Sequence, residues 1–436
     1  MKRSLVLLFS FLFSLSVQAA GIIINTFDLP NGLKVIFSPN EQMEAVAVCA
    51  YFMCGAKNDP VEAPGASFLY QYLRFGQTEN LGPSDHFLLI NKLGGSVNSR
   101  IEYDNAYSTQ LVPASDIGVA LWLESERIKS LRLSDREIDF QKSQVYNRFN
   151  RMLETNTAFR AQSWVNSALL KQTPYATPVY GDLNRLRSIN NDLIREAGRN
   201  FQNIARVLLV VTGKFDINEL KAGINKFFQD IPPGTKINPA VYRKFNTQKM
   251  YLYKNWLSEG ADNHFVIYGI RVPSKLSYDY PLFEFLRYYL ADQRISRLDY
   301  ILNKVNQLNI AISANLTGYF EANALIFQLS TARRVNLEKA KYIMERELSA
   351  LMTNPITNAD LRTTKSTMEI DFLKRLSGLE EKAFAIGEYY HMYGQLDLAE
   401  AQLNRTRRIS SYDIGEMAKK YLTKDNRVIL NVYSNK

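Results

Sequence analysis

The sequence predicts an α+β fold of two homologous domains, each an antiparallel sheet covered by helices. Strand and helix patterns mix without a helix between every pair of strands, which favours antiparallel sheets over a doubly wound parallel one. A helix followed by an apolar strand near residue 195 recurs near residue 415. The turn-forming stretch Ile231–Pro239 lies between the two occurrences and is typical of a linker.

Composition fits this size of protein. The chain has 436 residues, of which 46% are hydrophobic and 22% charged, as in a globular protein of two or three domains. The formal net charge is +10, but Lys and Arg are scattered. Scattered charge indicates a solvated basic surface, and we expect no nucleic-acid partner.

The first residues predict a targeting segment. Lys2 and Arg3 precede the apolar run Leu5–Val17, and small residues follow at Ala19 and Ala20. This pattern predicts a signal peptide over residues 1–20, because the run is shorter than a membrane-spanning helix. No later stretch is apolar enough to span a bilayer. We therefore expect export, most simply to a bacterial periplasm.

The predicted first domain, residues 21–235, begins with strands and ends with a helix followed by a strand. Phe27–Phe37 predicts two strands around the turn Pro30–Gly32, and Ala45–Met53 predicts an apolar strand. Ser134–Asn150 predicts a long helix. Near the end of this half, a helix opening at Asp192 and continuing to Phe201 precedes the strand Arg206–Val211.

The predicted second domain, residues 236–436, repeats this order. It has an apolar strand at His264–Arg271, a long helix at Asp360–Leu376, a helix at Asp413–Leu422 and a strand at Arg427–Val432. Four residues recur 221 positions later in identical form: Asp192, Ala197, Arg206 and Val211 as Asp413, Ala418, Arg427 and Val432. A second repeated segment is Ile90–Leu93, which is similar to Leu302–Val305. Several repeated segments in the same order predict an internal duplication. Asp192 and Asp413 are expected at helix N-caps.

The only two cysteines are Cys49 and Cys54. They lie in or just after one predicted strand at an odd separation, so their side chains point to opposite faces. This spacing predicts two buried thiols rather than a disulfide.

Several short motifs occur in an order that is typical of one family. They are Asn31–Val35, Cys54–Ala56, Gly65–Phe75 with Thr78 and Glu79, Leu93–Asn98, Tyr103 with Asp104, Gly213–Asp216 and Ser296–Leu298. With these motifs the chain resembles the pitrilysin, insulinase and mitochondrial-processing-peptidase family of zinc metallopeptidases, the inverzincins. The resemblance implies half of a clam-like chamber, which commonly pairs with a second two-domain chain.

The family's active helix carries H-x-x-E-H, in which two imidazoles bind zinc and the Glu activates water. Alignment on Gly65 and Phe75 puts Phe68, Gln71 and Tyr72 at those three positions.

Shifting the frame by one gives Ser67, Tyr70 and Gln71, which suit zinc no better. The family's distal Glu ligand falls near Asn147 or Arg148.

These residues are poor zinc ligands. Phe68 has no donor atom, the Gln71 amide cannot take a proton, and Tyr72 ionises far above neutral pH. The three histidines, His86, His264 and His391, lie far apart in the sequence. We therefore expect no zinc and no other cofactor, although the family binds zinc.

The resemblance implies two further features. The family's Arg/Tyr pair, which holds the substrate near the scissile carbonyl, falls on Asn303 and Ile310, so those contacts are lost. A nearby edge strand pairs with extended substrate in relatives, and here it is Val97–Ile101. Backbone pairing depends little on side chains, so Val97, Asn98, Ser99 and Arg100 are candidate peptide-binding residues. The alternative is a strand with only a framework role.

Three functions follow as hypotheses. The first is a non-catalytic subunit that pairs with a zinc-bearing member of the family and helps to hold peptide. The second is an active zinc metalloendopeptidase with an atypical metal site. The third is a stand-alone module that binds a peptide or protein.

Overall fold

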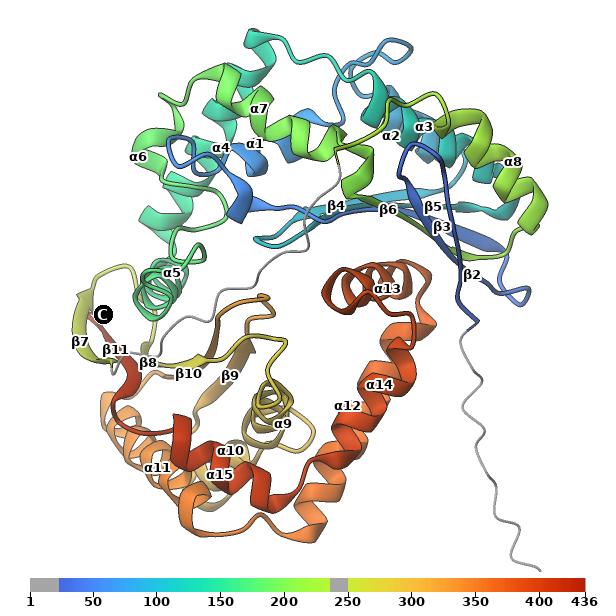
Figure 1. The fold of residues 1–436 in the computed structure, drawn as a ribbon. Coiled ribbons are helices and arrows are strands. Elements are labelled where there is room, and N and C mark those ends of the chain that lie inside the picture. The colour runs from blue at the N-terminus through green and yellow to red at the C-terminus, as the bar shows by residue number, and fades with distance from the viewer. Residues whose placement is uncertain (1–22, 236–249, 436) are drawn as a thin grey trace, which may run out of the picture.

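The computed structural model describes residues 23–235 and 250–435, which form two β-sheets with helices around and between them (Figure 1). The predicted signal peptide at residues 1–20 lies outside the described residues, as does the end of the predicted linker. The domain boundary predicted between residues 235 and 236 falls at the edge of the described part and stays a prediction.

The first sheet has the spatial order β1-β2-β6-β3-β5-β4. Its strands are β1 (Asn25–Asp28), β2 (Lys34–Pro39), β3 (Ala45–Phe52), β4 (Ser96–Ile101), β5 (Ala106–Pro113) and β6 (Val207–Gly213). Its pairs are antiparallel except β2 with β6, which run parallel. A parallel pair needs a long connection, and most of this half of the chain lies between these two strands.

The second sheet has the order β7-β11-β8-β10-β9. Its strands are β7 (Met250–Ser258), β8 (His264–Val272), β9 (Ala311–Leu316), β10 (Asn323–Thr331) and β11 (Asn426–Ser434). Again one pair is parallel, β7 with β11, while the other pairs are antiparallel. Apart from the additional edge strand β1, the two sheets therefore share one strand order, as the predicted duplication requires.

Helices cover both sheets. Those before residue 235 are α1 (Ala66–Leu73), α2 (Asp85–Lys92), α3 (Ile117–Lys129), α4 (Asp135–Thr155), α5 (Thr157–Leu169), α6 (Leu183–Leu186), α7 (Asn191–Gln202) and α8 (Ile217–Phe228). Those after residue 250 are α9 (Tyr280–Ala291), α10 (Arg297–Asp299), α11 (Arg334–Thr353), α12 (Asn358–Ser377), α13 (Leu379–Tyr393), α14 (Leu398–Arg408) and α15 (Ser411–Tyr421). A π-helix, η4 (Tyr300–Val305), continues α10, and single 3₁₀ turns are η1 (Ala56–Asn58), η2 (Ala114–Asp116) and η3 (Ile204–Arg206).

The repeated helix–strand pairs are confirmed, but their predicted caps are wrong. Asn190 caps α7 and Ser410 caps α15, each through a side-chain oxygen that accepts a backbone N–H. Asp192 and Asp413 lie instead in the first helical turn, where the positive end of the helix dipole favours a carboxylate.

The two halves exchange one helix each. α13, from the second half, packs on β3 and β6 of the first sheet, while α5, from the first half, packs on β8 and β11 of the second (Figure 1). The first residue of α5, Thr157, is 222 positions before that of α13, Leu379, so the two helices are equivalent copies of the repeat. Each half therefore contributes a helix to the buried core of the other half.

Strand β6 shows why the exchange is needed. Val207, Leu209 and Val211 face a core that includes residues of α3, α7 and α8, whereas Leu208 and Val210 face the opposite core with α13. Every residue of β6 is buried. A strand that is apolar at each position must be covered on both faces, and α13 supplies the second cover.

A glycine brings α13 close to the first sheet. A Cβ at Gly387 would lie 2.8 Å from Cγ of Tyr51 on β3, closer than carbon atoms approach. The hydroxyl of Thr212, at the end of β6, also donates to the carbonyl of Leu379 at 2.8 Å. Close packing and a buried hydrogen bond therefore fix α13 against the first sheet.

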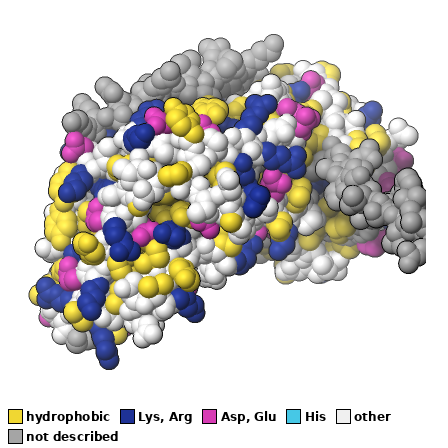
Figure 2. All heavy atoms as spheres, turned by 90° about the horizontal axis from the view of Figure 1, so that it is seen from below, with side chains coloured by type: hydrophobic (Ala, Val, Ile, Leu, Met, Phe, Trp, Pro, Cys, Tyr) yellow, Lys and Arg dark blue, Asp and Glu magenta, His cyan; other side chains and the backbone are white. Residues whose placement is uncertain are grey.

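The remaining expectations concern thiols and surface. Cys49 and Cys54 are buried free thiols in two different cores, as their spacing predicts, and burial raises the pKa of each to about 12. No helix within residues 23–235 and 250–435 is long and apolar enough to cross a membrane. Figure 2 shows Lys and Arg scattered among hydrophobic and acidic side chains on the face it displays.

Candidate functional site

The candidate site is built on α1. Gly65, just before the helix, has a left-handed φ of +99°, and a Cβ there would lie 2.6 Å from the Tyr180 carbonyl oxygen. The Asp59 carboxylate accepts hydrogen bonds from the backbone N–H of Gly65 at 2.7 Å and of Ser67 at 2.9 Å. Burial raises the pKa of Asp59 to about 6 although these bonds favour the charged form. Gly65 and Asp59 thus fix the first turn of α1 close to the loop that contains Tyr180.

Phe68, which the alignment puts at the first ligand position of the family motif, belongs to the apolar core. Its ring lies 5.5 Å from those of Phe149 and Tyr72, both in edge-on geometry. The side chain is buried in a cluster that joins α1, α4 and α7. A ring in this place contributes packing and no lone pair.

Gln71, which the alignment puts at the position of the family's general base, bonds β4 through its carboxamide. Its Nε2 donates to the carbonyl of Ser99 at 3.0 Å, and its Oε1 accepts from the backbone N–H of Ile101 at 2.8 Å. The two partners fix the orientation of the amide, since only nitrogen can donate and only oxygen can accept here. The side chain is committed to the backbone.

The alignment puts the other two ligand positions at Tyr72 and near Asn147 or Arg148. The Tyr72 hydroxyl accepts a hydrogen bond from Nη1 of Arg148 on α4 at 3.3 Å. Asn147, also on α4, is exposed. Helices α1 and α4 are packed together, and the Tyr72–Arg148 hydrogen bond joins them at the position next to Asn147.

The donor set does not fit zinc. Aligned side chains offer a phenyl ring, two amides and a phenol, and none of these is a usual zinc ligand. Within the described ranges, no group of three His, Cys, Asp or Glu residues is placed to hold a metal ion.

The histidines lie elsewhere. His86 is on α2 and His391 on α13, where burial lowers their pKa values to about 2 and about 3. His264 on β8 accepts from the backbone N–H of Ser434 at 3.0 Å.

Asn303 and Ile310 lie close together, but both are turned inward. Asn303, in the π-helix, donates to the carbonyl of Ile310 at 2.8 Å and accepts from its N–H at 2.7 Å. The Ile310 side chain is buried in the second-half core. As with Gln71, a carboxamide is used to bond the backbone of a following segment.

The predicted peptide-binding residues lie on a sheet edge. β4 pairs with β5 on one side only and is the last strand of the first sheet. Asn98 and Arg100 are exposed, whereas Val97 and Ser99 are half-buried. Arg100 forms an ion pair with Glu102. The edge position is the one that strand addition requires, and Gln71 already holds part of it.

A buried polar cluster joins the halves, and its central residue is Asp104, which the sequence indicates only as part of a family motif. The Asp104 carboxylate accepts from Lys57 Nζ at 2.6 Å, from the Tyr175 hydroxyl at 2.9 Å and from the backbone N–H of Phe320 at 2.9 Å. Phe320 lies in the β9–β10 loop, so one carboxylate links both halves. Burial, followed by the charge of Asp104, raises the pKa of Tyr175, which therefore stays a donor.

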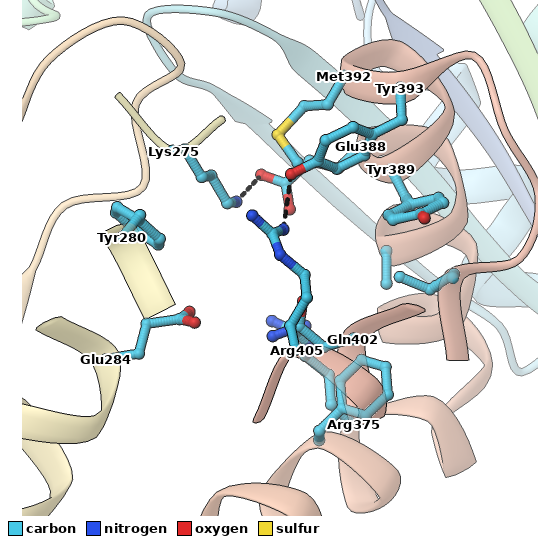
Figure 3. A pocket seen from close by; sticks show the side chains of 13 residues that line it. Lys275, Tyr280, Glu284, Arg375, Glu388, Tyr389, Met392, Tyr393, Gln402 and Arg405 are labelled. Carbon is cyan, nitrogen blue, oxygen red and sulfur yellow. Dashed lines mark hydrogen bonds and ion pairs between the residues drawn. The ribbon is translucent and has the colours of Figure 1, made fainter. Parts of the chain in front are cut away.

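A small cavity of about 60 Å³ lies among α9, α12, α13 and α14 (Figure 3). Lys275 and Glu388 form an ion pair of 2.8 Å at its wall, and Arg405 donates to the Tyr393 hydroxyl at 2.7 Å. The Glu284 carboxyl also lines it, and its pKa is raised by burial. A cavity of this volume is large enough for water but too small for a peptide.

Two family models match this sequence. Residues 34–183 match insulinase (peptidase family M16), and residues 188–368 match the peptidase M16 inactive domain. The chain belongs to the M16 peptidase family. This agrees with the resemblance given by the sequence motifs. Among curated proteins, none matches.

Solved structures share the fold of this family member at low identity. A protease from Helicobacter pylori is 18% identical with a TM-score of 0.85, covering 94% of this chain and 99% of that one. An M16 inactive domain from Pseudomonas fluorescens is 14% identical with a TM-score of 0.81, covering 95% and 98%. The Escherichia coli periplasmic protease PqqL is 14% identical with a TM-score of 0.77, covering 94% of this chain but 48% of PqqL.

Proposed function

We propose that this chain is a non-catalytic M16 subunit that pairs with a zinc-bearing member of the family and holds peptide in the shared chamber. One observation carries the proposal: in the alignment, the positions for both imidazoles and the base fall on Phe68, Tyr72 and Gln71, and that for the distal carboxylate falls near Asn147 or Arg148. Phe68 is packed in the core and Gln71 is bonded to β4. A site without ligand atoms cannot polarise water.

Pairing is supported by size. The chain matches about half of PqqL, a periplasmic protease whose first half has a structure similar to this chain, with a TM-score of 0.75. A single polypeptide of twice the length thus contains what two chains of this size would supply together. We propose that a second M16 chain provides the other half of the chamber here, and that the pair acts after export.

The peptide-holding role is supported by the edge of β4. Strand addition uses backbone groups, so it survives the loss of catalytic side chains. The exposed Asn98 and Arg100 side chains flank the edge and contribute polar contacts to a bound peptide. Peptide held there is presented to the partner's zinc site, in keeping with the division of roles that we propose.

The first test separates the subunit from an enzyme. The purified chain is assayed for hydrolysis of fluorescein-labelled casein with and without a chelator, and its zinc content is measured. We expect neither chelator-sensitive hydrolysis nor stoichiometric zinc from the isolated chain, and both from the complex recovered from the native cell envelope. Chelator-sensitive hydrolysis by the isolated chain would refute the proposal.

A second test restores the ligands. The quadruple variant Phe68→His, Gln71→Glu, Tyr72→His and Asn147→Glu places zinc ligands and a base on the packed helices α1 and α4. We expect this variant to bind zinc when the wild type does not, because α1 and α4 pack against each other and the new side chains are usual zinc ligands. Equal zinc binding by both proteins would show that the wild type has a site elsewhere.

A further inference from the structure

The edge of β4 is partly occupied by a side chain of the same molecule. In an antiparallel pair, alternate residues direct their N–H and C=O groups to the partner strand. Gln71 bonds the Ser99 carbonyl and the Ile101 N–H, so the groups that point away from β5 belong to Val97, Ser99 and Ile101. These are the groups with which an added peptide strand would pair.

The Gln71 carboxamide bonds this edge as a peptide would. A residue in a parallel strand donates its N–H to one carbonyl and accepts, through its C=O, from the N–H two residues further on. Gln71 makes this pair of bonds, at 3.0 Å to Ser99 and 2.8 Å to Ile101, with Arg100 between them. The side chain therefore takes the place of one residue of a bound strand.

This contact requires glutamine rather than the family's glutamate. An ionised carboxylate has acceptors only, so it accepts from Ile101 N–H but repels the Ser99 carbonyl oxygen. The change from glutamate to glutamine thus removes the general base and creates the hydrogen bond to the Ser99 carbonyl. In the described part of the chain, no hydrogen bond from another residue reaches the outward groups of Val97, so the upstream end of the edge stays open.

We infer that Gln71 is a latch on the edge of β4: its carboxamide occupies the Ser99 and Ile101 backbone groups, and an extended peptide pairs along the whole strand only after displacing it. The inference rests on the proposed peptide-holding function and describes how that site is regulated. The ligand is an extended peptide backbone of little sequence preference. Peptide binding first costs the two Gln71 bonds, which corresponds to roughly tenfold in affinity.

The test compares Gln71→Ala and Gln71→Glu with the wild type. Gln77→Ala is the matched control, because Gln77 is an exposed glutamine just after α1. Binding of a fluorescein-labelled, unstructured 15-residue peptide of Ser, Thr, Val and Lys is followed by anisotropy. We expect roughly tenfold tighter binding by Gln71→Ala, a smaller gain by Gln71→Glu, and no change in Gln77→Ala.

A second readout does not depend on peptide. Amide hydrogen exchange at Ile101 is measured in the same variants without ligand, and we expect roughly tenfold faster exchange in Gln71→Ala but not in Gln77→Ala. Unchanged Ile101 exchange, or equal affinities of Gln71→Ala and wild type, overturns the latch while peptide binding stands. Failure of every variant to bind peptide, with faster Ile101 exchange in Gln71→Ala, overturns the proposed function and the latch's role in it.

Discussion

The exchanged helix α13 predicts that the two halves unfold as one unit. Ile386 on α13 is 2% exposed and lies in the core formed with β2, β3 and β6 of the first sheet. Ile386→Ala removes three carbon atoms, at about 0.8 kcal/mol each, and leaves part of a cavity. The expected loss in the free energy of unfolding is therefore about 3 kcal/mol.

The assay is urea denaturation together with hydrogen exchange, read separately on β6 of the first sheet and β10 of the second. We expect one cooperative transition and an equal loss of protection in both strands. Ile370→Ala on α12 is the matched control, because Ile370 is 49% exposed, and it should change stability by less than about 0.5 kcal/mol. A loss confined to β6 would refute the single-unit argument.

Three other predictions follow from buried polar groups and close packing. Asp104→Asn leaves Lys57 without its nearest carboxylate, so we expect the free energy of unfolding, measured by urea denaturation, to fall by about 3 kcal/mol. The control Asp28→Asn breaks only an exposed ion pair and should lower the free energy of unfolding by less than about 1 kcal/mol. The His391 pKa falls to about 3 in the folded protein, chiefly by burial, so the unfolded state binds the extra proton below about pH 6.5. Stability should then fall by about 2 kcal/mol from pH 7 to pH 5, and this part should be missing in His391→Gln; identical pH profiles would contradict the assignment. Gly387→Ala should lower the melting temperature despite alanine's better helix propensity, because the new methyl group meets the base of the Tyr51 ring, and an unchanged melting temperature would mean that α13 can shift.

The elements that the sequence predicted are those with local signals. The strand around Cys49, the long helix that begins near Ser134 and the two repeated helix–strand pairs follow from side-chain periodicity, and the structure confirms them. The caps of α7 and α15 were misplaced because Asp is favoured both at the cap and in the first turn. One parallel pair in each sheet also went unpredicted, since strand order depends on contacts between distant segments.

In the candidate site, too, the sequence predicts the residue types but not the contacts that their side chains make. The residue types at positions 68, 71, 72 and 147 already indicate that zinc has no ligands there, because donor chemistry belongs to the side chain itself. What those side chains do instead is a matter of placement. Nothing near Gln71 in the sequence indicates that its amide would bond Ser99 and Ile101, some thirty residues away, or that Asp104 would join two halves.

The sequence by itself determined the family, the repeat and the requirement that apolar strands such as Val207–Val211 be buried. It did not determine which helix meets that requirement. Helices of one half cover only one face of their own sheet, so α5 and α13 are exchanged between the halves. An apolar surface specifies that it must be buried but not by which partner, and that choice is made only when the whole chain packs.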